Sequence, residues 1–93
     1  MHTHHLTIRG RVQGVGYRDA LCNEATRLQV RGWVRNRADG SVEALVQGAL
    51  ESLHALASWA RRGPAAARVT EVLVESIEHA TAERAPFRRL PTL

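Results

Sequence analysis

An arginine that closely follows two glycines is the first feature of this chain that could do chemistry. In the stretch GRVQGVGYRDA, residues 10–20, Gly14 and Gly16 flank a valine, and Arg18 comes two residues after the second glycine. Glycines tolerate positive φ angles, which can turn successive backbone N–H groups toward one point. A guanidinium adds a permanent charge and two parallel donors. The stretch is typical of a cradle for an anion such as a phosphoryl group, although a plain tight turn with a solvated arginine fits the loop alone equally well.

The charged residues favour an anionic ligand and exclude several kinds of site. All 13 basic residues are arginines, so the lysine of a P-loop, of a Schiff base or of a pyridoxal phosphate site is excluded. Residues 1–37 hold seven arginines against two acidic residues, whereas residues 38–93 hold six against seven. The N-terminal part, which contains the glycine loop, should therefore project a positive field toward an anionic partner.

The length and the remaining composition indicate one soluble domain. The 93 residues are enough for a single hydrophobic core, so we expect one domain over residues 1–93. The apolar runs are too short to span a membrane, and residues 1–5 lack the apolar core of a secretion signal. The single cysteine, Cys22, cannot form an internal disulfide, which suits a reducing compartment. We therefore expect a cytoplasmic protein, and a monomer by default.

Hydrophobic periodicity predicts the element order strand, helix, strand, strand, helix, strand. Apolar and polar residues alternate over residues 6–12, and a helical stripe over residues 17–28 follows the glycine loop. Further along come a hairpin, a helix closed by Gly63-Pro64, a last strand with a bulge or register break after Val69, and a short edge segment. Their predicted ranges are 30–48, 50–60, 68–78 and 86–93.

The hairpin offers two registers, of which one keeps the two faces of the sheet distinct. A two-residue turn at Asp39-Gly40 mixes polar and apolar side chains on each face. A three-residue loop over residues 38–40, with Gly40 left-handed, avoids this mixing. We therefore predict that the loop pairs Arg35 with Glu43, Val34 with Ala44 and Trp33 with Leu45.

This element order is the split β-α-β pattern of a ferredoxin-like α+β fold, an antiparallel sheet with two helices on one face. In this topology the first two strands run parallel with the third between them. The loop after the first strand and the end of the second strand then lie at one edge of the sheet, about 10 Å apart. Arg18 follows the first strand and Asn36 ends the second. Asparagine is also common before turns, so it is this placement that makes Asn36 a candidate for holding a phosphate-sized group together with Arg18.

Two stretches of the chain resemble signatures of the acylphosphatase family. GRVQGVGYR resembles the phosphate-binding signature, Gly-x-Val-Gln-Gly-Val-x-aromatic-Arg. GWVRNRADGSVEALVQG resembles the Gly-aromatic-Val-basic-Asn signature, with the later glycines in place at Gly40 and Gly48. The similarity covers most of the chain. It implies an enzyme that hydrolyses the carboxyl–phosphate bond of small acyl phosphates, releasing inorganic phosphate, and that needs no cofactor.

The resemblance also implies roles for individual residues. Arg18 would clamp the phosphate and Asn36 would position the attacking water. The leaving carboxylate is a weak base, so no strong general acid is needed, and neither stretch holds a His, Cys or Glu placed as a nucleophile or base. Two departures are Tyr17, where the family usually has phenylalanine, and Gln29 at the left-handed end of the first helix. The phosphate-binding residues implied by the resemblance are Gln13, Gly14, Val15, Gly16, Tyr17 and Arg18.

Alternatives from other classes are a non-catalytic anion-binding domain, a fragment of a larger carbamoyl-transferring protein, and an RNA-binding module. RNA-binding ferredoxin-like domains stack bases on aromatic side chains of their central strands. The four aromatic residues here are scattered, and the last strand is acidic. We therefore expect no nucleic-acid or membrane partner. We also expect no metal site, because the histidines at positions 2, 4 and 5 should form an exposed cluster without a fixed scaffold.

Overall fold

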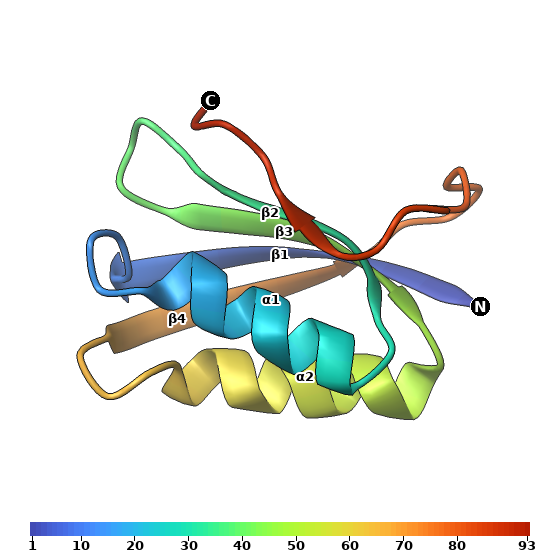
Figure 1. The fold of residues 1–93 in the computed structure, drawn as a ribbon, viewed down its shortest axis with the longest axis horizontal. Helices are drawn as coiled ribbons and strands as arrows, with labels where there is room; N and C mark the ends of the chain where they lie inside the picture. Colours follow the sequence, from blue (N-terminus) through green and yellow to red (C-terminus); the bar gives the residue numbers. More distant parts are fainter.

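The computed structural model describes residues 1–93 and has the predicted order of elements (Figure 1). A short additional strand, β5, pairs with β2 within the predicted edge segment. The last long strand ends two residues earlier than predicted. The elements are β1 (His2–Arg11), α1 (Tyr17–Arg27), β2 (Arg31–Asn36), β3 (Val42–Gly48), α2 (Leu50–Arg62), β4 (Arg68–Ser76) and β5 (Arg88–Arg89).

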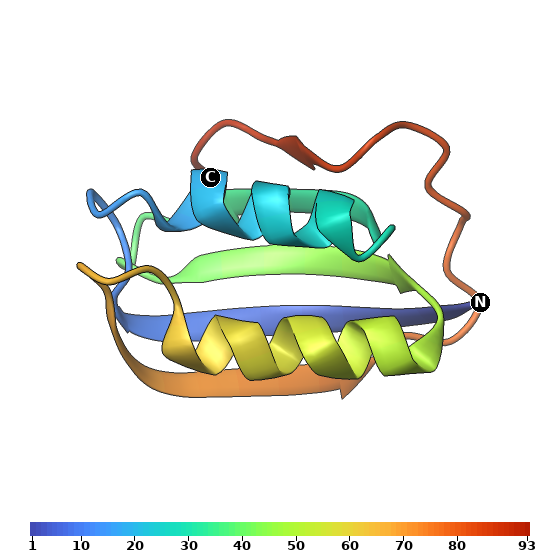
Figure 2. The ribbon, with the colours of Figure 1, turned by 60° about the horizontal axis from the view of Figure 1, so that its bottom comes forward.

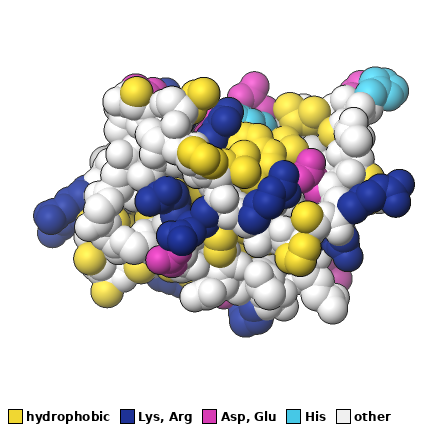
Figure 3. Space-filling model, turned by 45° about the horizontal axis from the view of Figure 1, so that its top comes forward, with side chains coloured by type: hydrophobic (Ala, Val, Ile, Leu, Met, Phe, Trp, Pro, Cys, Tyr) yellow, Lys and Arg dark blue, Asp and Glu magenta, His cyan; other side chains and the backbone are white.

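The sheet has the strand order β4-β1-β3-β2-β5, and both helices cover one of its faces (Figures 1 and 2). β3 lies between β1 and β2, as a ferredoxin-like fold requires, and the pairs among β1 to β4 are antiparallel. Only β5 runs parallel to its neighbour, β2. The loop after β1 and the end of β2 therefore lie at the same edge of the sheet. The opposite face carries no helix, and Figure 3 shows arginine side chains among hydrophobic ones when the molecule is viewed from that side.

The core lies between the sheet and the two helices, because alternate residues of the central strands are apolar and point the same way. Leu6 and Ile8 of β1 and Val34 of β2 are fully buried there. The predicted hairpin register is confirmed, with Arg35 opposite Glu43 and a three-residue loop closed by Gly40 at φ +91°. A register shift after Arg9 of β1 confirms the predicted irregularity in β4, its partner strand. Neither helix has the length and apolar character that a membrane-spanning helix needs.

The N-terminal histidines depart from the sequence-based expectation. β1 begins at His2 and pairs with β3 from its first residue, so these side chains have a fixed scaffold. His4 is buried near His54 of α2, and burial lowers the pKa of His4. His5 Nε2 lies 2.8 Å from Glu43 Oε2. The prediction of an unstructured, exposed cluster was therefore wrong. Strand pairing, which short-range sequence patterns do not specify, orders this segment.

Candidate functional site

A pocket of about 210 Å³ opens where β1 gives way to α1 and β2 ends. Arg18 and Asn36, which the predicted topology brings to one edge of the sheet, both line it. A larger depression of about 460 Å³ lies at the opposite end of β1, away from the glycine loop. The residues that line the smaller pocket are Val12, Gly14, Gly16, Tyr17, Arg18, Asp19, Asn36 and Arg89.

The loop that leads into α1 presents free amide groups. Gly14 and Gly16 have φ angles of +73° and +78°, and Gly16 is the N-cap of the helix. None of the backbone N–H groups of residues 14–18 donates a backbone hydrogen bond within the protein. The first turn of α1 adds the positive end of the helix dipole. The loop and the helix start can therefore donate several hydrogen bonds to a bound anion.

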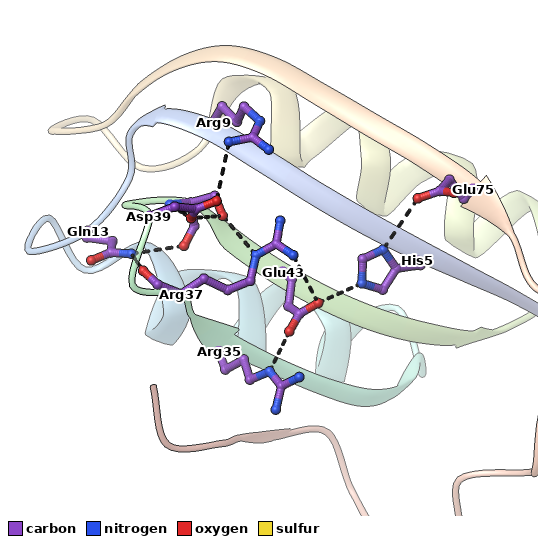
Figure 4. A network of polar contacts seen from close by, with 9 residues as sticks. His5, Arg9, Gln13, Arg35, Arg37, Asp39, Glu43 and Glu75 are labelled. Atoms are coloured by element: carbon purple, nitrogen blue, oxygen red, sulfur yellow. Dashed lines mark hydrogen bonds and ion pairs between the residues drawn. The ribbon is translucent and has the colours of Figure 1, made fainter. Parts of the chain in front are cut away.

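Gln13 holds this loop in place from outside the pocket. Its Nε2 donates to the carbonyl oxygens of Arg37 and Ser41, at 2.8 and 2.9 Å (Figure 4). Both carbonyls belong to the hairpin turn that follows Asn36, so one side chain ties the loop to the end of β2. The side chain of Val15 packs against the core.

Tyr17 uses its side chain in the core. The ring lies 5.6 Å from the ring of Trp59, between centroids, and the hydroxyl donates to the carbonyl oxygen of Ala60 at 2.7 Å. That carbonyl lacks its usual helical donor because the residue four positions on, Pro64, has no N–H. Burial raises the pKa of Tyr17 well above its ordinary value. The side chain therefore fastens the start of α1 to the end of α2.

Asn36 and Arg18 both have polar groups without a protein partner. Asn36 follows the buried Val34 by two residues, so both lie on the helix-covered face of β2. Asn36 Oδ1 is buried and accepts no hydrogen bond, and leaving a buried acceptor unpaired costs about 1–3 kcal/mol. The guanidinium of Arg18 takes part in none of the ion pairs of the protein. The pocket thus contains an unpaired cation and an unpaired acceptor.

Three residues that line the pocket were not predicted as site residues: Val12, Asp19 and Arg89. Nη1 of Arg89 lies 2.6 Å from Oδ1 of Asp19, which sits in the first turn of α1. The expected edge segment contains Arg89, but its sequence does not say along which strand it lies. The half-buried Cys22 lies nearby, and burial raises the pKa of its thiol. Cys22 therefore stays protonated near neutral pH, which does not suit a nucleophile.

Comparisons with known proteins agree with each other. The sequence profile of the acylphosphatase family matches residues 4–88. An acylphosphatase of Cupriavidus pinatubonensis is 55% identical over 75 residues, which are 81% of this chain and 83% of that protein. One of Thiobacillus denitrificans is 55% identical over 78 residues, 84% of this chain and 88% of that protein. The crystal structure of the acylphosphatase from Bacillus subtilis matches with a TM-score of 0.93 at 31% identity, covering 97% of this chain and 99% of that one.

Proposed function

The chain belongs to the acylphosphatase family, and we propose that Arg18 and Asn36 carry out its reaction in the pocket between the loop and β2. An acylphosphatase hydrolyses the carboxyl–phosphate bond of a small acyl phosphate to a carboxylate and inorganic phosphate. One observation carries the assignment of residues: an unpaired guanidinium, unpaired loop amides and an unpaired amide oxygen share a single small pocket.

Arg18 and the amides of residues 14–18 bind the phosphoryl group. A guanidinium can donate two parallel hydrogen bonds to phosphoryl oxygens, and the loop amides add neutral donors aimed by the glycine φ angles. Phosphoryl transfer passes through a loose transition state whose charge is spread over the phosphoryl oxygens. Positioning and charge neutralisation are therefore the main contributions that these groups need to make.

Asn36 positions the water. Its Oδ1 accepts a hydrogen bond from that water. This orients the water so that a lone pair of the water oxygen points toward phosphorus, on the side opposite the acyl oxygen. As the water oxygen bonds to phosphorus, the bond from phosphorus to the acyl oxygen breaks and its electron pair leaves with the carboxylate. One proton of the water passes to a phosphoryl oxygen, so the products are a carboxylate and dihydrogen phosphate. No acid on the protein is needed, because the leaving carboxylate is a weak base.

We also propose that residues 1–93 act as one domain, as a cytoplasmic monomer, and without a metal ion or nucleic acid. The single domain is supported by one core that both helices and four strands share.

The placement of the aromatic residues argues against an RNA-binding role. Tyr17 is buried in the core and Trp33 of β2 lies under the guanidinium of Arg35, 4.8 Å from the ring centroid. A platform for stacking bases is not available there.

The test is hydrolysis of acetyl or benzoyl phosphate in the presence of a chelator, by the wild type, Arg18→Gln and Arg27→Gln. Arg27 is the matched control, because it is an exposed arginine of the same helix that pairs with Glu24. We expect Arg18→Gln to lower kcat/KM by about 10³-fold or more, in the range of arginines that stabilise phosphoryl transfer. Arg27→Gln should stay near the wild type. A folded wild type without turnover contradicts the activity, and an active Arg18→Gln contradicts the role of Arg18.

A further inference from the structure

We propose that Arg89 is a second guanidinium that binds the phosphoryl group, brought to the pocket by β5 and held there by Asp19. The inference rests on the proposed function of the pocket, since it assigns one more residue to the same site. It concerns a residue outside both signature stretches.

The backbone around Arg89 is fixed along β2. Arg89 lies opposite Val34 in the parallel pair, and the N–H of Leu90 donates to the carbonyl of Val34 at 2.9 Å. Further along, the N–H of Leu93 donates to the carbonyl of Asn36 at 3.1 Å. The tail therefore runs beside β2 as far as the residue proposed to position the water, as the ribbon also shows (Figure 2). Arg89 is thus presented to the pocket by a hydrogen-bonded strand.

The side chain of Arg89 is placed so that most of its donors remain free. One nitrogen, Nη1, pairs with Asp19, whereas a guanidinium has five N–H donors on three nitrogens. The two side chains are 52% and 67% exposed, and ion pairs so exposed contribute little to stability. A purely stabilising role therefore explains the contact poorly. Anchoring by Asp19 leaves the rest of the planar group available to a ligand in the pocket that Arg89 itself lines.

The charges that line the pocket support the same assignment. Asp19 follows Arg18 directly and lines the pocket too, so its carboxylate offsets the charge of Arg18 and repels a phosphoryl group. Arg89 restores a net positive charge. Two roles of Arg89 would give this result. In the first, Arg89 neutralises Asp19 and does nothing more; in the second, it also contacts the phosphoryl oxygens. Because Arg89 lines the same small pocket as Arg18 and Asn36, we infer direct contact.

The neighbouring arginine offers a matched control. Arg88 pairs with Glu83 at 3.0 Å and its Nη1 lies 3.4 Å from the carbonyl oxygen of Gly32. It does not line the pocket. Arg88→Gln therefore removes the same charge from the same two-residue strand without touching the site.

The experiment titrates inorganic phosphate by calorimetry and measures kcat and KM for benzoyl phosphate in Arg89→Gln, Arg88→Gln, Asp19→Asn and the Asp19→Asn/Arg89→Gln double variant. We expect Arg89→Gln to weaken phosphate binding and raise KM by about tenfold or more, as loss of a charge-assisted hydrogen bond does. Arg88→Gln should stay within about twofold. The double variant should recover only part of the affinity lost in Arg89→Gln, because removing the Asp19 charge relieves repulsion but restores no guanidinium donor. Arg89→Lys, which keeps the charge but loses the fork, should lie between Arg89→Gln and the wild type.

Two results would overturn the inference. One is phosphate affinity in Arg89→Gln equal to that of Arg88→Gln. The other is full recovery of the wild-type affinity in the double variant, since Arg89 would then act only by neutralising Asp19. Thermal unfolding checks that each variant is folded, and Arg89→Lys serves if Arg89→Gln is not. A wild type that binds phosphate but hydrolyses no acyl phosphate contradicts the proposed activity, while the phosphate titrations still decide the role of Arg89.

Discussion

The pocket and a polar cluster on the uncovered face of the sheet use similar side chains in opposite ways. The cluster, here called the open-face cluster, consists of His5, Arg35, Arg37 and Glu43. Glu43 is almost fully buried and accepts hydrogen bonds from His5 and Arg35, with Arg37 Nη1 at 3.7 Å (Figure 4). In the pocket, by contrast, Arg18 has no acidic partner and Asn36 Oδ1 has no donor.

The difference separates arginines that stabilise the fold from arginines that are free for a ligand. A buried carboxylate surrounded by donors stabilises the folded state, because its hydrogen bonds replace those that water would make. Unpaired groups in the pocket stabilise nothing until an anion and a water arrive. Mutations in the open-face cluster should therefore change stability, and mutations in the pocket should change turnover.

After the loss expected for Arg18→Gln, the largest expected effect is that of Asn36→Ala. Without Oδ1 to orient the water, kcat should fall by about 10²–10³-fold, as happens when one positioning group is lost. The affinity for inorganic phosphate should stay within about twofold, because Arg18 and the loop amides are intact. Steady-state kinetics and a phosphate titration measure the two quantities. Asn23→Ala, an exposed asparagine of α1, is the control, and equal losses of binding and turnover would refute the division of roles.

The next largest effect is that of Glu43→Gln on stability. The neutral amide cannot satisfy the arginine donors that now surround the carboxylate, so the free energy of unfolding should fall by about 2 kcal/mol. Turnover of the folded protein should be unchanged. Urea unfolding measures the loss, and Glu75→Gln is the control because Glu75 is 70% exposed on the same face. A loss of kcat without a loss of stability would place Glu43 in the site instead.

The contribution of Glu43 should also depend on pH. Burial by itself raises the pKa of Glu43, but hydrogen bonds from His5 and Arg35 and the charges of Arg35 and Arg37 outweigh burial and hold the pKa below its ordinary value of 4.5. A carboxyl group whose pKa is lower in the folded state stabilises the protein above the unfolded pKa. That stability disappears as the pH falls through the folded pKa. The difference between wild type and Glu43→Gln should be full near neutrality and shrink below about pH 4.5, and a constant difference down to pH 3 would be inconsistent with this account.

The sequence predicts the parts of the fold and the site that depend on local pattern. Alternation and turn chemistry predict the hairpin register, and hence the side of the sheet on which Asn36 lies. The resemblance to the acylphosphatase family places Gln29 at the left-handed end of the first helix, where its φ is +59°. Topology then brings Arg18 and Asn36 into one pocket. Sequence does not predict where Arg89 lies, or that His4 and His5 are ordered, because these depend on which distant strand a terminal segment joins.

A smaller effect is expected where the two regions meet. Gln13 joins the pocket loop to the hairpin turn that precedes Glu43, through hydrogen bonds to two carbonyls. Gln13→Ala should release the loop and lower kcat by about tenfold, since small displacements of positioned groups are costly. Stability should fall by about 1–2 kcal/mol. Kinetics at a temperature where the variant is fully folded separate the effect on kcat from the effect on stability. An unchanged kcat would show that the hydrogen bonds of Gln13 serve only the fold.

The smallest expected effect is that of Tyr17→Phe. Tyr17 lies inside a signature stretch, and the substitution tests whether its side chain, as well as its backbone, takes part in the site. The substitution removes the donor to the carbonyl of Ala60, which Pro64 cannot replace, so stability should fall by about 1–2 kcal/mol. The ring, its contact with Trp59 and the backbone at position 17 all remain, so kcat and KM should not change.

Thermal unfolding measures the stability, and steady-state kinetics of the same preparation measure kcat and KM. Arg27→Gln is the control for a surface substitution without effect. An altered kcat would mean that the hydroxyl reaches the substrate. An unaltered kcat would show that the side chain of Tyr17 serves the fold, as the open-face cluster does, and that only its backbone belongs to the pocket.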